Sequence, residues 1–401
     1  MIMKAIRSPK LLLPTSNIDP TKWSVVACDQ FTSEPEYWAE LREFIGDAPS
    51  TLDLIYPEAY IGEGDFEKEV DHIAATMKDY YRKGIFSSHD GYVLCVRTLS
   101  DGKKRTGLIA EIDLEAYDPF GELDVRATEK TVRERLPLRM RIRRDAILEL
   151  PHILILLDDP DKLVIETLKE KKGEELYSFP LNMKGGYLQG YALSDGDVEN
   201  AFACLEASRE GRSSFYLAVG DGNHSLAAAR ECWSEIKKGL SPEEREVHPA
   251  RYALVEIVNL FEDSLVFEPI HRVLFGGEDF VKNFPNDEEG REVVLFDKGE
   301  RKTVRLKGTA PETIALIQKY LDDYIARNDG AKQDYIHGYE NLVKVSKEGV
   351  GILMLAIEKE TMFSYIEKNG VLTRKSFSMG EAVDKRYYYE SRLITPVTED
   401  K

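Results

Sequence analysis

Residues 215–236, FYLAVGDGNHSLAAARECWSEI, decide how this chain is organised. The apolar run 215–219 predicts a short buried strand that stops at Gly220. Asp221 to Ser225 form a polar turn, and apolar residues then recur at helical spacing from Leu226 onward. The first turn of such a helix presents main-chain N–H groups and the positive end of the helix dipole to an anion. The stretch therefore predicts a strand–turn–helix unit with an anion site that contains an acid and a histidine.

The remaining segments alternate between strand and helix patterns. The periodicity predicts a strand over 23–28, an amphipathic helix over 66–83, and a hairpin of strands 92–98 and 106–112. Such alternation indicates an α/β or α+β fold with more than one domain. We expect an N-terminal α/β region over 1–165, a phosphate-binding region over 166–276 and a C-terminal α+β region over 277–401, with approximate boundaries; the three can also form one compact unit.

Composition narrows the classes of function. The formal net charge of −18 argues against broad binding to nucleic acids or anionic membranes, because both carry negative charge. The cysteines lie far apart, which argues against a zinc site or a disulfide framework and favours a reducing cytoplasm. We find no apolar run of transmembrane length and expect no membrane association. The expected partners are a small-molecule substrate and a nucleotide.

The turn carries chemistry that suits phosphate. Asp221 can hold Mg²⁺ or accept a proton from an attacking hydroxyl, and His224 can contact a phosphoryl oxygen. Gly222 lets the main chain approach a ligand closely. The alternative is a tight structural turn in which Asp221 only caps the helix. The chain has neither a GxxxxGK[ST] phosphate loop nor a GxGxxG after a strand, so two common nucleotide folds are unsupported.

Other charged residues give weaker signals. Basic residues are densest over 126–144, where they either supply an arginine to a phosphate site or pair with the surplus of acids. His271 and Arg272 follow a predicted strand over 265–270 and form a second candidate site. His152, after Leu150 and Pro151, is expected to be structural.

The sequence VGDGNHSLAAA resembles the Asp-Gly-His-His-Arg motif of the domain-of-unknown-function 1015 family. Segments 23–31, 107–113, 128–131 and 268–272 resemble further blocks of that family, so the resemblance covers most of the chain. It implies a module like those of the ParB and sulfiredoxin superfamily, in which a strand, a turn and a helix bind nucleotide phosphates. One related branch comprises free-serine kinases that use ADP or ATP.

By this resemblance Asp221, Gly222 and His224 match the motif, whereas Asn223 replaces a histidine and Ser225 replaces the arginine. Glu129 matches a further block, and a substitute for the lost arginine is expected from Arg272, Arg212 or the basic stretch 126–144. We therefore interpret the chain as a phosphotransferase for a small hydroxylated metabolite such as serine, with ADP or ATP and Mg²⁺. Its catalytic candidates are Asp221, His224 and Glu129, with Asp221 also as metal ligand. Its phosphate-binding candidates are Gly222, Asn223, Ser225, His271 and Arg272.

Two other functions remain open from the sequence. The chain can bind a nucleotide or metabolite as a regulator without turnover, or it can be a protein–protein scaffold in which the turn is structural.

Overall fold

The structure is a computed structural model that describes residues 5–119, 123–211, 213 and 215–396. Arg212, one candidate substitute for the lost arginine, lies outside the described residues. The chain divides into two compact units. Unit 1 comprises Met1–Ala127, Thr131–Ser264 and Glu381–Lys401, and unit 2 comprises Thr128–Lys130 and Leu265–Gly380. Both units mix helices and sheets, which confirms the expected α+β fold of more than one domain.

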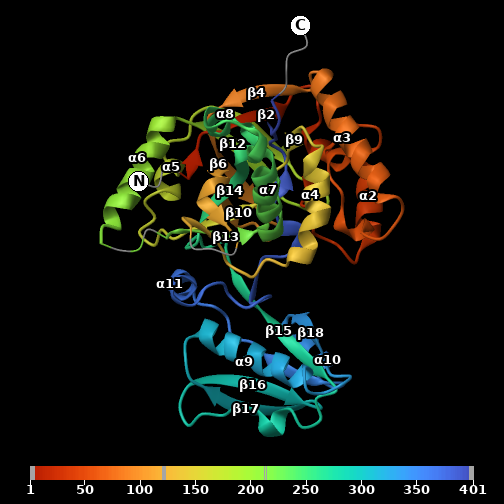
Figure 1. The fold of residues 1–401 in the computed structure, drawn as a ribbon, viewed down its shortest axis with the longest axis vertical. Coiled ribbons are helices and arrows are strands. Elements are labelled where there is room, and N and C mark those ends of the chain that lie inside the picture. Colours follow the sequence, from red (N-terminus) through yellow and green to blue (C-terminus); the bar gives the residue numbers. More distant parts are fainter. Residues whose placement is uncertain (1–4, 120–122, 212, 214, 397–401) are drawn as a thin grey trace. The chain divides into compact units, whose positions relative to one another are not determined.

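Unit 1 is built around a mixed sheet of ten strands over the described residues, in the order β11-β12-β5-β6-β14-β10-β13-β8-β7 with β1 beside β6 (Figure 1). Its strands are β1 (Ile6–Arg7), β5 (Tyr92–Thr98), β6 (Lys104–Asp113), β7 (Tyr117–Asp118), β8 (Val125–Ala127), β10 (Leu154–Leu157), β11 (Glu175–Pro180), β12 (Tyr187–Leu193), β13 (Leu217–Asp221) and β14 (Tyr252–Asn259). The hairpin expected from 92–98 and 106–112 is confirmed, since β5 pairs antiparallel with β6.

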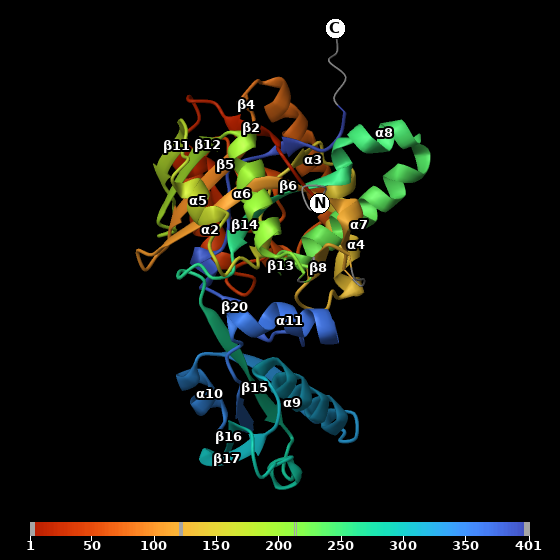
Figure 2. The same ribbon diagram turned by 90° about the vertical axis from the view of Figure 1, so that its left-hand side faces the viewer.

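Helices cover both faces of this sheet. Leu94 and Val96 of β5 pack with α5 (Ile165–Lys169), α6 (Asp195–Ser208) and α7 (Asn223–Ile236). Val93 and Cys95 point to the other side and pack with α2 (Pro35–Ile45) and α3 (Phe66–Arg82). In Figure 1, α5 and α6 accordingly lie on the left of the sheet and α2 and α3 on its right, and Figure 2 shows the molecule from the side of α5 and α6. The period of two along a strand thus buries both of its faces.

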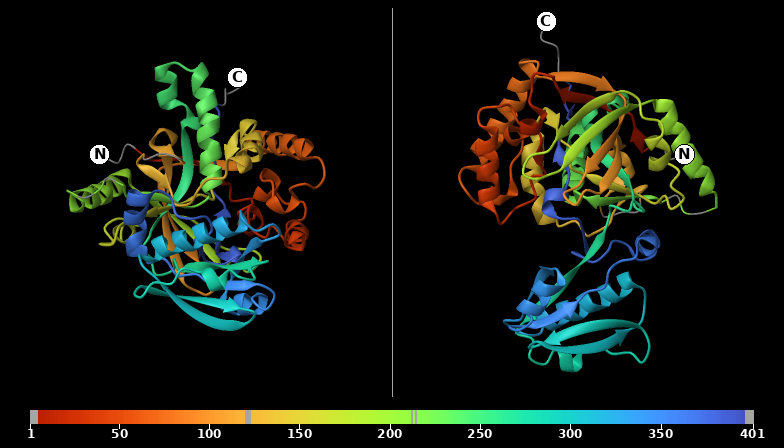
Figure 3. Two further views of the ribbon diagram at one scale, coloured as in Figure 1. Left: turned by 60° about the horizontal axis from the view of Figure 1, so that its bottom comes forward. Right: turned by 180° about the vertical axis from the view of Figure 1, so that it is seen from behind.

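The C-terminal segment returns to unit 1 and pairs with parts of the chain that are remote in sequence. β21 (Tyr387–Tyr388) pairs with β3 (Val25–Val26), and β22 (Arg392–Leu393) pairs with β9 (Leu148–Glu149). Figure 3 shows this segment, in dark blue, running among the strands and helices of unit 1. The remaining elements of unit 1 are α1 (Pro20–Trp23), β2 (Lys10–Pro14), β4 (Phe86–Asp90), α4 (Leu136–Arg144) and α8 (Pro242–Val247).

Unit 2 has a sheet of six strands over its described residues, in the order β17-β16-β19-β15-β18 with β20 beside β15. Val273, Val294 and Phe296 of this sheet pack against Leu342. The elements of unit 2 are β15 (Phe267–Phe275), β16 (Arg291–Asp297), β17 (Glu300–Leu306), α9 (Ala310–Ile325), β18 (Lys332–His337), α10 (Tyr339–Val345), β19 (Val350–Leu353), α11 (Lys359–Asn369) and β20 (Phe377–Met379).

Two local predictions differ from the structure. The strand expected over 23–28 shortens to Val25–Val26, because Asp19 caps a helical turn that ends at Trp23. The strand expected over 215–219 instead runs to Asp221, so this acid ends the strand and α7 begins at Asn223. The helix over 66–83 is confirmed as α3. Within the described part of the chain, each helix is too short or too polar to cross a bilayer.

Candidate functional site

The turn between β13 and α7 depends on a single glycine. Gly222 caps α7 with a φ of 81°, in the left-handed region that side-chain-bearing residues rarely adopt. A Cβ built on Gly222 would lie 3.0 Å from the Cα and the Cγ1 of Ile153. The glycine therefore allows both the reversal of the chain and its close approach to the neighbouring segment.

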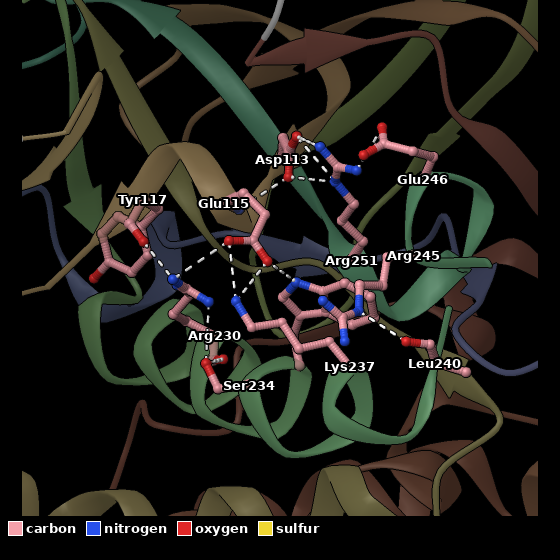
Figure 4. Close-up of polar contacts among 11 residues, drawn as sticks. Asp113, Glu115, Tyr117, Arg230, Ser234, Lys237, Leu240, Arg245, Glu246 and Arg251 are labelled. Carbon is pink, nitrogen blue, oxygen red and sulfur yellow. Dashed lines mark hydrogen bonds and ion pairs between the residues drawn. The ribbon is translucent and has the colours of Figure 1, made fainter. Parts of the chain in front are cut away.

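Polar contacts fix α7 against the end of β6, as Figure 4 shows. Glu115 accepts hydrogen bonds from Trp233 Nε1 at 2.6 Å and from Lys237 Nζ at 2.8 Å. Arg230 Nη2 lies 3.6 Å from the same carboxylate, and Arg230 Nε donates to the Tyr117 carbonyl at 3.1 Å. These contacts hold the C-terminal half of α7, and with it the position of the turn at its N-terminus.

Asp221 is paired with a lysine that the sequence analysis did not single out. Its Oδ2 lies 3.1 Å from Lys385 Nζ, and its Oδ1 accepts from the Gly222 N–H at 2.9 Å. Burial by itself raises the pKa of the Asp221 carboxyl. The charge and hydrogen bond of Lys385, with smaller contributions from His152 and the Gly222 N–H, lower the pKa by more than burial raises it. The net shift is downward, so Asp221 is ionised at neutral pH.

Each of the three residues after Gly222 has a polar group that is hydrogen-bonded within the protein or buried. His224 Nε2 accepts from the Val132 N–H at 3.1 Å, which places the proton of its neutral ring on Nδ1. The Ser225 N–H donates to the Gly222 carbonyl at 3.0 Å. Asn223 Oδ1 is buried without a hydrogen-bond partner among the described residues.

The Ser225 hydroxyl belongs to a chain of hydrogen bonds through His152. Ser225 Oγ lies 3.0 Å from His152 Nε2, and His152 Nδ1 lies 2.9 Å from the Tyr388 hydroxyl. The Tyr388 hydroxyl also contacts Cys28, donating to its Sγ at 3.2 Å and accepting from its N–H at 3.2 Å. His152 thus connects α7 to the C-terminal segment, which nothing in its local sequence indicated.

A cavity of about 140 Å³ lies beside this chain of hydrogen bonds. Ser225 and Ala228, one turn apart on α7, form part of its wall. Other walls are largely apolar and come from α3 and α4 and from the segments around them; they include Leu54, Met77, Leu138, Ile142, Leu148 and Ile153. The cavity also contacts His152, Cys28 and Tyr388. It is therefore a largely apolar space whose wall also carries Ser225 and two ion pairs, Arg139 with Glu58 and Arg143 with Glu149.

The other predicted site residues lie in unit 2. Glu129 accepts from the Ser376 N–H at 3.1 Å, and burial is the largest cause of its raised pKa. His271 Nδ1 accepts from the Met354 N–H at 3.2 Å, and burial, then Arg272, lowers the pKa of His271 to about 4.

Arg272 donates to Gln318 Oε1 at 2.9 Å and to the Arg374 carbonyl at 3.0 Å, and burial lowers its pKa to about 10. The expected strand-end position of His271 and Arg272 is wrong, because both lie inside β15, which pairs with β18 and β19. All three unit 2 candidates thus have partners within their own unit, and their assignment to the phosphate site stays a prediction.

Arginines from the second half of the basic stretch 126–144 pair with acids in unit 1. Arg139 pairs with Glu58, Arg141 with Glu67, Asp71 and Asp145, Arg143 with Glu149, and Arg144 with Glu235. For these arginines, the interpretation as partners of surplus acids is confirmed.

The described residues do not by themselves form a metal site at Asp221. Nowhere in the described ranges do three or more His, Cys, Asp or Glu side chains gather so that they could hold an ion. Asp221 also has the Lys385 ammonium on one carboxylate oxygen. Because a protein-held Mg²⁺ needs several oxygen ligands, a magnesium ion here would depend on ligand oxygens from a bound nucleotide. The Mg²⁺ expected from the sequence stays a prediction.

A family model matches most of the chain. The chain belongs to the family described as protein of unknown function (DUF1015), whose model matches residues 12–350. No curated protein matches the chain.

Solved structures of low sequence identity are also similar. A free serine kinase in complex with AMP shares 13% identity and has a TM-score of 0.38, over 68% of this chain and 94% of that chain. A free serine kinase variant in complex with ADP also shares 13% identity, with a TM-score of 0.37, over 68% of this chain and 95% of that chain. A conserved hypothetical protein from Pyrococcus furiosus shares 11% identity and has a TM-score of 0.33, over 66% of this chain and 93% of that chain.

Proposed function

We propose that unit 1 holds a nucleotide phosphate at the turn around Gly222 and transfers a phosphoryl group to a small hydroxylated metabolite such as serine. The observation that carries this proposal is the Asp221–Lys385 ion pair at the N-terminus of α7. It places an ionised acid and a cation at the helix end that presents main-chain N–H groups. Lys385 thereby supplies the positive charge of the motif arginine that Ser225 replaces, in place of Arg272, Arg212 or the basic stretch 126–144.

Each residue of the turn has a task that fits its chemistry. The first main-chain N–H groups of α7, at Asn223 and His224, lack carbonyl partners within a regular helix and suit phosphate oxygens. The ammonium of Lys385 neutralises charge on the transferred group. The hydroxyl oxygen of the metabolite attacks the terminal phosphorus, the bond from that phosphorus to the leaving phosphate breaks, and the hydroxyl proton passes to Asp221.

Several finer points of the proposal rest on the sequence alone. These are ADP or ATP as the donor, Mg²⁺ as the ion, serine as the acceptor, and a ParB- or sulfiredoxin-like character of the module. The free serine kinases among the similar structures are described in complexes with AMP or ADP. They share only 13% identity with this chain, so the proposal depends on the residues of its own turn.

A second candidate function is nucleotide or metabolite binding without turnover. It is favoured by the internal contacts of the turn, where His224 Nε2 and the Ser225 hydroxyl already have partners. In that case Asp221 and Lys385 would recognise the ligand but complete no reaction.

The test combines turnover with binding. The purified chain is incubated with ADP or ATP and a panel of hydroxy amino acids, and phosphorylated products are measured by mass spectrometry. Asp221→Asn and Lys385→Met should each lower the rate by about 10²-fold, as expected for loss of one preorganised charge. The exposed Lys238 provides a matched control, so Lys238→Met should keep the full rate.

Full activity of Asp221→Asn would contradict the proposal. Nucleotide binding detected by calorimetry, with no product after long incubation, would instead support binding without turnover. Absence of both binding and product would refute both functions.

A further inference from the structure

The hydroxyl of Ser225 has a basic partner that other contacts hold in place. The Tyr388 hydroxyl already gives its only proton to Cys28 Sγ. Its 2.9 Å contact with His152 Nδ1 therefore needs the proton on the histidine. We therefore assign the Nδ1–H tautomer to His152, which leaves a lone pair on Nε2 to accept a hydrogen bond from the Ser225 hydroxyl at an Oγ–Nε2 distance of 3.0 Å.

This is the arrangement that activates a serine for nucleophilic attack. A hydroxyl bonded to an imidazole, with a third group orienting the ring, is the recurring pattern of serine nucleophiles on unrelated folds. Burial, and then Cys28, raises the pKa of the Tyr388 hydroxyl well above its ordinary value, so Tyr388 stays neutral and only orients the ring. Burial raises the pKa of the Cys28 thiol to about 12, so Cys28 does not compete as a thiolate.

Another serine of the same helix lacks these features. The Ser234 hydroxyl donates to the Arg230 carbonyl at 2.9 Å and accepts from Arg230 Nη1 at 3.0 Å. Its partners are a main-chain oxygen and a guanidinium, neither of which can take up a proton at neutral pH. Ser234 is therefore an internal standard for a serine of α7 without a base.

The cavity beside Ser225 is suited to the body of a small molecule that is mainly apolar, because most of its wall is apolar and the charged groups Glu58, Arg139 and Glu149 are already in ion pairs. Its volume of about 140 Å³ is close to that of apolar protein cavities that hold benzene, ~150 Å³. Arg143 is part of the wall, and its Nη2 is buried without a hydrogen-bond partner among the described residues, while Nη1 binds Glu149 at 2.7 Å. A carbonyl oxygen in the cavity would give this unused donor a partner.

We propose that Ser225 and His152 form an acyl-transfer site for small carboxylic esters with an aryl or branched alkyl group. Ser225 Oγ attacks the ester carbonyl carbon while its proton moves to His152 Nε2. The bond from that carbon to the alcohol oxygen then breaks, and His152 returns the proton to the departing alcohol. Water releases the acid in a second step, again with His152 as base, and restores the Ser225 hydroxyl.

The residues around Ser225 have different roles in the proposed reaction, according to whether they contact the reacting hydroxyl. His152 contacts the reacting hydroxyl and is a catalytic residue, whereas Tyr388 acts through His152 and is a positioning residue. Arg143, in the wall of the same cavity, is the proposed donor to the carbonyl oxygen. This activity uses no nucleotide and is separate from the phosphotransfer proposed above.

The experiment labels the serine directly. The full chain is treated with phenylmethylsulfonyl fluoride in the absence of nucleotide, and peptide mass spectrometry locates the modified residue. We expect the label on Ser225, and a rate about 10²-fold lower in His152→Gln, as general-base catalysis predicts. Ser234→Ala should label at the rate of the unaltered chain. Hydrolysis of 4-nitrophenyl butyrate should decrease in parallel with labelling.

Two further variants keep the test decisive if His152→Gln unfolds. Tyr388→Phe keeps the packed ring but removes the oxygen that orients His152, so labelling should slow several-fold in protein that circular dichroism shows to be folded. Ala228→Leu places three more carbons in the cavity and should slow labelling, whereas Ala75→Leu on the exposed face of α3 should not. The proposal is overturned if folded protein is not labelled at Ser225, or if none of these substitutions at the site slows the reaction.

Discussion

Replacing Arg386 with methionine should test how the C-terminal segment is held in unit 1. The Arg386 side chain is 3% exposed and lies between two carboxylates that are 0% exposed. Its Nε is 3.2 Å from Glu256 Oε2, and its Nη2 pairs with Glu390. Burial by itself lowers the pKa of Arg386, but the charges of Glu390 and Glu256 outweigh burial and raise the pKa well above its ordinary value. The Arg386 guanidinium therefore stays charged.

The magnitude follows from the partners that remain. Without Arg386, Glu256 keeps only Arg105, at 3.5 Å, among its ion-pair partners in the described residues. Glu390 keeps the hydroxyl of Tyr177. Removing one partner of a buried pair costs about 3–5 kcal/mol, because the other charge is left in a poorly solvating interior. Because the free energy of unfolding of a domain is only about 5–15 kcal/mol, this change would remove a large part of the stability of unit 1.

Urea unfolding followed by tryptophan fluorescence measures this loss selectively. The chain has three tryptophans, Trp23, Trp38 and Trp233, and all lie in unit 1. The matched control is Arg144→Met, since Arg144 and Glu235 are 56% and 52% exposed and such pairs contribute about 0–1 kcal/mol.

The pH dependence and a double variant test the cause. The deficit of Arg386→Met should shrink between pH 7 and 5. A buried carboxyl without its cation has a raised pKa, so the folded variant binds more protons than the unfolded chain and gains stability as pH falls. Arg386→Met with Glu390→Gln should recover part of the loss. A deficit no larger than that of Arg144→Met would refute the reasoning.

Three further predictions concern the turn and unit 2. Gly222→Ala should lower the free energy of unfolding by about 1–3 kcal/mol through its positive φ and the contact with Ile153, whereas Gly196→Ala, in an open helical position, should be neutral or slightly stabilising. Because its pKa is lowered in the folded chain, ionised Asp221 stabilises the fold above about pH 4, and this stabilisation is lost in more acid solution. Asp221→Asn should therefore make the free energy of unfolding, measured with urea, depend less on pH below about pH 4. The pKa of His271 is lowered to about 4 in the folded chain, so below about pH 6.5 the unfolded chain binds more protons than the folded chain. The free energy of unfolding of unit 2 should therefore fall by up to about 3 kcal/mol from pH 7 to 4. His271→Gln should remove this pH dependence in melts followed by circular dichroism.

The sequence by itself determined the local elements. Periodicity and glycine positions predict three elements to within a few residues of their observed bounds: the helix over 66–83, the hairpin of β5 and β6, and the strand–turn–helix around Gly222. The position of Asp221 at an anion-attracting helix end follows from the same short stretch. Such features are readable because the interactions that fix them are close in the chain.

Only the tertiary structure decided which side chains meet the turn. Lys385 is 164 residues from Asp221, His152 is 73 residues from Ser225, and Tyr388 is 236 residues from His152. The cation that contacts Asp221 is Lys385 of the C-terminal segment, and the arginine expected to stand in for Ser225 stays a prediction. The position of Lys385 depends on the pairing of β21 with β3 and on the buried charges around Arg386. These contacts arise from packing of the whole unit, and a local pattern carries no record of them.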